Sequence, residues 1–346
     1  MRNQEETAYI ANKDELCSYL LTLPYNIYAV TEKQGRYVFA NVDKISDPGD
    51  KYTPTLLPPK KYLYPNKETL FCFKKTTEEI SEIEDKEERI LFGIRPCDIN
   101  AVNLMDRIFS DGYKDSYYAK RRKNTILIGV DCCSPCDDHS FCYSVGHLEV
   151  KEGYDLLLKD IGIAYFILMG SERGKELMNK FTKFRETTPQ DIEQINEIEK
   201  KKESLFINKF KTNVDNLPLL FRSSMSSPIW EELAKRDLGC GACNVDCPTC
   251  YCFDVQDRLE FNVEDGSRIR NWDGCMLRDF TLVASGEVFR PGKADRLKHR
   301  FNRKFHYLMN TYKKSHCVGC GRCARDCLAG ISPVEVVNSL VGGMKI

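Results

Sequence analysis

Four cysteines near the C-terminus, separated by two, two and three residues, constrain this chain more than any other feature of its sequence. They are Cys317, Cys320, Cys323 and Cys327. In bacterial two-cluster ferredoxins, three cysteines of such a C-x2-C-x2-C-x3-C run hold one 4Fe–4S cluster, and the fourth cysteine holds a second cluster. A zinc knuckle, the alternative, usually presents its ligands as two separated pairs. The spacing therefore favours iron and sulfide over zinc.

Two glycines occupy the gaps of this run. Gly319 and Gly321 each stand directly before or after Cys320. Glycine adopts positive φ angles without steric cost, and this freedom lets backbone amides turn toward the sulfides of a cluster. The loop is therefore expected to wrap closely around its ligand.

A second cysteine run repeats the first with one substitution. Its cysteines are Cys240, Cys243 and Cys247. Asp237 stands where the leading cysteine belongs. Exchange of the fourth cysteine between the runs predicts two ligand sets, namely Cys317, Cys320, Cys323 and Cys247, and Cys240, Cys243 and Cys327 with a fourth ligand still open. That fourth ligand is either a carboxylate oxygen of Asp237, which would make one iron more exchangeable, or Cys250 or Cys252; a three-iron cluster is the remaining alternative.

Composition supports a metal-binding role for these thiols. The chain has 17 cysteines in 346 residues, and a reducing cytoplasm would not keep them as disulfides. Its 51 basic and 51 acidic residues cancel, so no overall field attracts nucleic acid or an anionic membrane. No apolar run approaches the roughly 20 residues of a membrane helix. Residues Met1 to Glu6 begin no secretory signal, and we expect a cytoplasmic protein.

The N-terminal half is predicted to be an α/β region with a mixed sheet. Arg89–Ile94 and Thr125–Val130 are short apolar runs rich in β-branched residues, as in strands buried on both faces. Asp98 is expected to cap a helix between them. A strand, helix and strand in this order predict a parallel pair with a right-handed crossover.

Cysteines follow both of these strands. Cys97 comes after the first and Cys132 after the second. Because sites in open α/β sheets lie beyond the carboxyl ends of the strands, we expect the two thiols to meet at one edge. A third cluster is a hypothesis, with the ligands Cys97, Cys132, Cys136 and Cys142. Further candidate ligands are Cys250, Cys252 and Cys275. For each single cysteine the alternative is a buried thiol that packs as a small apolar side chain.

The chain is predicted to divide into three segments. They are an α/β domain at 1–174, a charged helical connector at 175–228, and an α-helical two-cluster ferredoxin-like domain at 229–346. Tyr154 to Leu158 and Ile163 to Leu168 predict an antiparallel continuation of the first sheet. In the connector, Thr188 and Pro189 predict the start of a helix that runs to about Lys202.

Several stretches together resemble one family of redox subunits. They are Leu57–Lys61, Arg95–Ile99, Phe141–Gly146, Cys247–Cys252, and Phe289–Pro291 leading into Cys317–Cys327. These residues are similar to the iron–sulfur β subunit of soluble NADP-linked sulfhydrogenases and to the A subunit of anaerobic sulfite reductase. The resemblance covers nearly the whole chain. It implies a non-catalytic, electron-carrying subunit between a flavin subunit that binds NAD(P)H and a catalytic subunit of either type.

Two positions depart from the pattern of that family. Asp237 replaces the leading cysteine, and Ser140 replaces the first cysteine of a Cys-Phe-Cys sequence. The second change leaves Cys133 or Cys136 to supply the missing sulfur of the third cluster.

No bond-making active site is expected. The chain has no Gly-x-Gly-x-x-Gly or phosphate-loop sequence, and its five histidines include no pair at the helical spacing of metal ligands. The run from Arg290 to Lys304 is strongly basic. Such a helix offsets the negative charge of clusters, docks an acidic partner, or simply faces solvent. A zinc-stabilised nucleic-acid-binding or scaffold protein is the alternative function.

Overall fold

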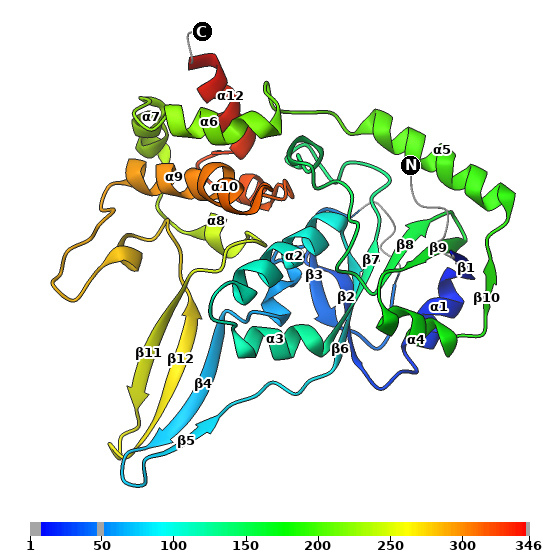
Figure 1. The fold of residues 1–346 in the computed structure, drawn as a ribbon, viewed down its shortest axis with the longest axis horizontal. Coiled ribbons are helices and arrows are strands. Elements are labelled where there is room, and N and C mark those ends of the chain that lie inside the picture. Colours follow the sequence, from blue (N-terminus) through cyan, green and yellow to red (C-terminus); the bar gives the residue numbers. More distant parts are fainter. Residues whose placement is uncertain (1–7, 47–51, 344–346) are drawn as a thin grey trace.

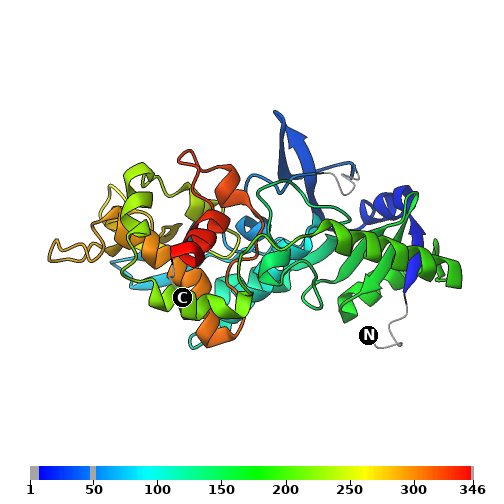
Figure 2. The ribbon, with the colours of Figure 1, turned by 90° about the horizontal axis from the view of Figure 1, so that it is seen from above.

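Two β-sheets and a group of C-terminal helices make up the fold (Figure 1). The computed structural model describes residues 8–46 and 52–343, so Met1 to Glu6 lie outside the described residues. Seen from above, the C-terminal helices occupy one end of the molecule, and the N-terminal helix and strand occupy the other end (Figure 2).

The larger sheet has eight strands in the order β10-β1-β9-β8-β7-β6-β2-β3. The strands are β1 (Tyr9–Asn12), β2 (Asn26–Lys33), β3 (Arg36–Asn41), β6 (Arg89–Ile94), β7 (Thr125–Val130), β8 (Leu156–Asp160), β9 (Ala164–Met169) and β10 (Phe184–Glu186). The neighbours β2, β6, β7 and β8 are parallel, and the other pairs are antiparallel. The predicted mixed sheet is therefore confirmed.

Strands β6 and β7 begin and end at the predicted residues, and both are buried along their whole length. The expected antiparallel continuation is correct for β9 but wrong for β8, which pairs with β7 in parallel. The segment between β7 and β8 is long enough to return the chain to the same end of the sheet, as a parallel connection requires. This connecting segment carries Cys132, Cys136 and Cys142.

Helices cover both faces of the large sheet. On one face, α2 (Pro96–Ser110) and α3 (Ser116–Lys123) contribute residues to a core that includes Leu91 and Leu127. On the other face, α1 (Lys13–Leu20) and α4 (Glu172–Asn179) pack in a core with Ile90 and Ile126. Adjacent residues of one strand thus face opposite cores, as the pleat of a strand dictates.

The start of α2 differs from its prediction. Arg95 is the N-cap residue, Pro96 lies in the first turn, and Asp98 therefore lies inside the helix instead of capping it. Proline is favoured at this position because its φ is already helical and its missing N–H would have no partner there. The carboxylate of Asp98 is left free for a contact described below.

The smaller sheet joins residues from both halves of the chain. Its antiparallel strands, in the order β11-β12-β4-β5, are β4 (Lys67–Lys74), β5 (Glu79–Glu82), β11 (Phe253–Leu259) and β12 (Asp265–Trp272). In Figure 1 it extends away from the body of the molecule. Strand β4 comes from the first predicted segment and β12 from the third. The boundaries of the three segments, 1–174, 175–228 and 229–346, remain predictions from the sequence.

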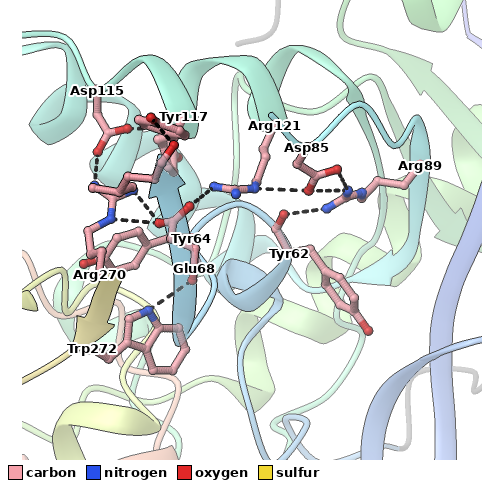
Figure 3. Close-up of polar contacts among 12 residues, drawn as sticks. Tyr62, Tyr64, Glu68, Asp85, Arg89, Asp115, Tyr117, Arg121, Arg270 and Trp272 are labelled. Atoms are coloured by element: carbon pink, nitrogen blue, oxygen red, sulfur yellow. Dashed lines mark hydrogen bonds and ion pairs between the residues drawn. The ribbon is translucent and has the colours of Figure 1, made fainter. Parts of the chain in front are cut away.

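A row of buried ion pairs connects this sheet to the larger one (Figure 3). Glu68 on β4 lies between Arg121 of α3, at 2.6 Å, and Arg270 of β12, at 2.5 Å. Arg121 also reaches Asp85, which pairs with Arg89 at the start of β6. Side chains from both sheets and from α3 therefore form one continuous network of ion pairs.

Short helices form the C-terminal part. They are α6 (Leu217–Ser223), α7 (Ile229–Arg236), α8 (Ala242–Val245), α9 (Lys293–Asn302), a π-helical turn (Arg303–Tyr307), α10 (Leu308–Tyr312), α11 (Arg322–Arg325) and α12 (Pro333–Gly343). Single 3-10 turns occur at Pro59–Tyr62, Tyr143–Val145, Val214–Asn216 and Arg278–Thr281. The aromatic residues Phe221, Trp230, Phe301 and Phe305 pack together at the centre of this part.

Helix α5 (Pro189–Leu205) confirms the helix predicted for the connector. Thr188 and Asp191 form a capping box, in which each side chain accepts a hydrogen bond from the backbone of the other residue. The helix lies along the edge of the molecule in Figure 1. None of the helices in the described ranges is long and apolar enough to span a membrane.

Candidate iron–sulfur sites

The two cysteine runs adopt the same backbone conformation. Gly239 and Gly241 have φ angles of 66° and 74°, and Gly319 and Gly321 have φ angles of 67° and 77°. A short helix follows each pair, α8 in the first run and α11 in the second, and these two helices contact each other. Positive φ at all four positions explains why glycine stands there.

One predicted ligand set meets in a single cavity. Its four members, Cys317, Cys320, Cys323 and Cys247, all line this cavity. Phe141, Phe301 and Phe305 form part of the same wall, so the thiols are shielded from water. Burial is the main cause that raises the pKa of Cys320 to about 11, so a positive counter-charge is needed to hold these thiols as thiolates.

The second predicted set is more open. Cys243 is partly buried in the C-terminal core, as is Cys327, whose sulfur accepts a hydrogen bond from the Ile331 amide at 3.3 Å. Cys240 is exposed. Asp237 follows the last residue of α7, and its Oδ2 atom is buried without a hydrogen-bond partner. Burial of a carboxylate oxygen without a partner costs free energy. The Asp237 oxygen therefore fits the role of a ligand to a bound cation.

The additional cysteines lie beside this second set. The Asn244 side-chain amide donates to the sulfur of Cys250 at 3.7 Å and to that of Cys275 at 3.5 Å. Cys250 and Cys252 line a small cavity together with Lys60. A hydrogen bond from the Cys250 thiol is the main cause that lowers the pKa of Cys247 well below its usual range. The structure thus brings Cys250 next to Asn244 and Cys247 of the run that begins at Cys240.

The N-terminal cysteines meet at the edge of the large sheet, as predicted. Cys97, Cys132 and Cys142 belong to one buried cluster of side chains, and Cys320 from the C-terminal run belongs to the same cluster. The thiol of Cys136 hydrogen-bonds to Cys132, and this bond is the main cause that lowers the pKa of Cys132 to about 7. Ser140 instead bonds to the backbone of Asp137.

Charged residues in α11 and directly after it connect the C-terminal cysteine run to the N-terminal region. Arg322 forms a fully buried, two-bond pair with Asp98, at 2.6 and 2.7 Å. The neighbouring residues Arg325 and Asp326 pair with Asp137 and Arg36. These three contacts were not predicted from the sequence, because pairing across more than 180 residues leaves no local signal.

Backbone contact between the two regions is equally close. The Phe141 amide donates to the Gly319 carbonyl at 2.7 Å. A Cβ atom placed on Gly319 would lie 2.5 Å from the backbone nitrogen of Cys142. Gly319 is therefore required for two separate reasons, its positive φ and the absence of space for a side chain.

Three buried cations surround the turn that joins Cys247 to Cys250. They are Lys60, Arg300 and Lys304, which we call the cation group. None of the three forms an ion pair with a carboxylate in residues 8–46 and 52–343. Unpaired buried charges are costly, so these residues fit a site that holds a strongly anionic group such as a thiolate-ligated cluster. Sequence analysis indicated the basic run from Arg290 to Lys304 but not which of its residues point inward.

The arrangement of the metal-binding residue types was also compared with that of a site for a single metal ion. In the part of the chain that the structure describes, no three His, Cys, Asp or Glu side chains are arranged around a single ion. Groups of thiols line cavities instead, as Cys247, Cys317, Cys320 and Cys323 do.

Comparison with known proteins agrees with this geometry. Residues 236–331 match the family described as a 4Fe-4S dicluster domain, which implies two clusters. The chain is 31% identical over 322 residues to sulfhydrogenase 2 subunit beta of Pyrococcus furiosus, a match that covers 92% of this chain and 93% of that protein. No solved structure matches the chain. This chain is therefore an iron–sulfur protein of the sulfhydrogenase beta subunit family.

Proposed function

We propose that the chain carries electrons within a cytoplasmic complex, between a flavin subunit that binds NAD(P)H and a catalytic subunit of hydrogenase or anaerobic sulfite reductase type. The observation that carries this proposal is the position of Cys320. It lines the cavity of the C-terminal cysteines and also packs against Cys97, Cys132 and Cys142. Two groups of cysteines that meet at Cys320 suit an electron relay. Electrons transfer between redox centres that lie close together.

The proposal includes three ligand sets. We assign Cys317, Cys320, Cys323 and Cys247 to one cluster; Cys240, Cys243, Cys327 and Asp237 to a second; and Cys97, Cys132, Cys136 and Cys142 to a third. Bound clusters would supply one-electron acceptors whose potentials depend on charge, hydrogen bonds and burial. The protein holds the thiols, excludes water with its aromatic walls and keeps the two cysteine-rich regions in contact through Asp98 and Arg322.

Metal analysis of protein purified anaerobically tests the cluster count. We expect about twelve irons with matching sulfide, or about eight if the N-terminal cysteines bind none. Cys132→Ser should remove about four irons, whereas Cys72→Ser, which changes an exposed thiol of β4, should remove none. A colourless protein with stoichiometric zinc would contradict the proposal as a whole.

The fourth ligand of the second cluster is tested by substitution. If Asp237 is the ligand, Asp237→Cys should make this cluster resist oxidative iron loss and should shift its reduction potential, because sulfur replaces a harder oxygen. Cys250→Ser and Cys252→Ser are the matched comparisons, and on this assignment they retain the cluster. Electron paramagnetic resonance distinguishes the variants. An unchanged spectrum for Asp237→Cys, with loss of a cluster in Cys250→Ser, would give the ligand role to Cys250.

Partner subunits are tested by activity and isolation. The chain alone should not oxidise NAD(P)H, because its sequence offers no nucleotide-binding motif. Affinity isolation of the full chain from its native cells should recover a flavin protein and a second redox subunit. Turnover of NAD(P)H by the isolated, flavin-free chain would refute the assignment.

A further inference from the structure

The cation group converges on a single turn of the chain. The Lys60 ammonium donates to the Cys250 carbonyl at 2.8 Å, and the Lys304 ammonium donates to the Thr249 hydroxyl at 2.7 Å. The Arg300 guanidinium lies 3.9 Å from the Cys250 sulfur. Arg300 and Lys304 also line the cavity that contains Cys247. Arg300 and Lys304 therefore border the cavity of the four cysteines, and Lys60 lies at the neighbouring residue Cys250.

The three charges of the cation group are buried, and thiols lie beside them. Lys60, Arg300 and Lys304 are only 3%, 6% and 8% exposed. Several other buried cations have carboxylate partners, such as Arg322 with Asp98 and Lys202 with Asp131. Arg95 and Arg296 are also buried, and their guanidinium groups donate to backbone carbonyls. Among the residues that the structure describes, the cation group has no ion pair with a carboxylate. Cysteine thiolates are the anionic groups placed to balance it.

Different parts of the chain supply the three cations. Arg300 and Lys304 are four residues apart, at the end of α9 and in the π-helical turn, so both face the cavity. Lys60 comes from the N-terminal half, and its ammonium lies 4.1 Å from the centre of the Trp272 ring. This cation–π contact holds the side chain over the turn. The position of Lys60 gives a physical reason for the Leu57–Lys61 stretch noted in the sequence.

We propose that Lys60, Arg300 and Lys304 raise the reduction potential of the cluster held by Cys247, Cys317, Cys320 and Cys323. This inference rests on the proposed function, since it requires the cluster. A thiolate-ligated cluster is already negative, and each added electron increases that negative charge. Nearby cations stabilise the reduced form more than the oxidised form, and a buried site with little water screens this effect only weakly. The three residues act on the cluster through their positive charge, without ligating it.

Redox titration of the anaerobically prepared full chain, followed by electron paramagnetic resonance, measures this effect. Arg300→Met and Lys304→Met remove one charge each and keep an unbranched, apolar stem. We expect each to lower the reduced-to-oxidised ratio of this cluster about tenfold at a fixed potential, which for one electron corresponds to a shift of about 59 mV to more negative values. Lys304→Arg keeps the charge and should restore most of the potential.

Lys298→Met is the matched control. It removes a positive charge from the same helix, but Lys298 is partly exposed and pairs with Asp295, so the potential should stay unchanged. Lys60→Met, on another element, provides an independent variant if Arg300→Met does not fold, and iron content and circular dichroism report folding.

The outcomes separate the two proposals. Lower potentials in the cation-group variants, with full iron content and an unshifted Lys298→Met, support the inference. Unchanged potentials in fully loaded Lys60→Met and Lys304→Met variants overturn it while leaving the proposed function intact. A wild-type protein that binds no cluster overturns both.

Discussion

At the scale of single residues, Gly319 makes a close backbone contact with the loop that carries Phe141 and Cys142. Gly319→Ala adds a methyl group 2.5 Å from the Cys142 nitrogen and puts alanine at a φ of 67°. Backbone strain of this kind costs about 1–3 kcal/mol, and the steric clash adds to it. We expect lower stability in thermal unfolding and partial loss of iron from the N-terminal cysteines.

Gly286→Ala separates the two causes. Gly286 also has a positive φ, 84°, but a Cβ there meets no atom within 4 Å. This control variant should lose only the stability that backbone strain costs, and it should keep all its iron. If both variants lost equal stability and neither lost iron, close packing at Gly319 would not be important for holding the N-terminal site.

Residue identity alone predicted part of the site. The spacing from Cys317 to Cys327, with Gly319 and Gly321 between the cysteines, was sufficient to predict a cluster-binding loop, because both metal ligation and positive φ are local requirements. The partner of Arg322 was not predictable. Its charge is visible in the sequence, but the carboxylate that neutralises it, Asp98, comes from another region of the fold.

At the scale of elements, Glu68 connects β4 with β12 and α3. Glu68→Gln removes the carboxylate that lies between Arg121 and Arg270 and leaves both buried guanidinium groups undercompensated (Figure 3). Breaking a buried ion pair in this way lowers the free energy of unfolding by about 3–5 kcal/mol. Denaturant unfolding of the iron-loaded protein should show this loss.

Asp257→Asn provides the comparison on the same small sheet. It breaks the exposed pair between Asp257 and Arg268 at its solvent-facing side, where water and salt screen the charges. We expect the unfolding midpoint to stay essentially unchanged. Equal effects of the two substitutions would show that the Glu68 contacts do not stabilise the junction of the sheets.

Elements with a strong local signal were predicted closely. Strands β6 and β7 begin and end at the expected residues, and α5 begins after Thr188, because buried apolar runs and capping residues act locally. The direction of β8 was wrong. Its residues indicate a strand, but they do not specify which neighbour it joins or in which direction the chain returns.

At the scale of the whole molecule, bound iron is expected to stabilise the cysteine-rich regions. Removal of iron by a chelator would leave Lys60, Arg300 and Lys304 buried without a strong counter-charge. Binding free energy of a metal group adds to folding free energy, so the apo protein should unfold about 5 °C or more below the loaded protein.

Hydrogen exchange locates the effect. Faster exchange after chelation should be concentrated near the two cysteine runs and the His139–Cys142 loop, while β6 and β7 remain protected. Identical midpoints and exchange patterns for loaded and apo protein would show that the fold does not depend on bound iron.

The sequence by itself determined that this protein is of the iron–sulfur type and which local elements it builds. Cysteine spacing predicts iron–sulfur ligation, and apolar periodicity predicts strands and helices, because both depend on residues a few positions apart. Only the tertiary structure decided that Cys320 lies beside Cys97, that β4 pairs with β12, and that Arg300 and Lys304 face inward. These features depend on contacts between segments far apart in the chain, where packing and charge neutralisation act across space and leave no periodic pattern in the sequence.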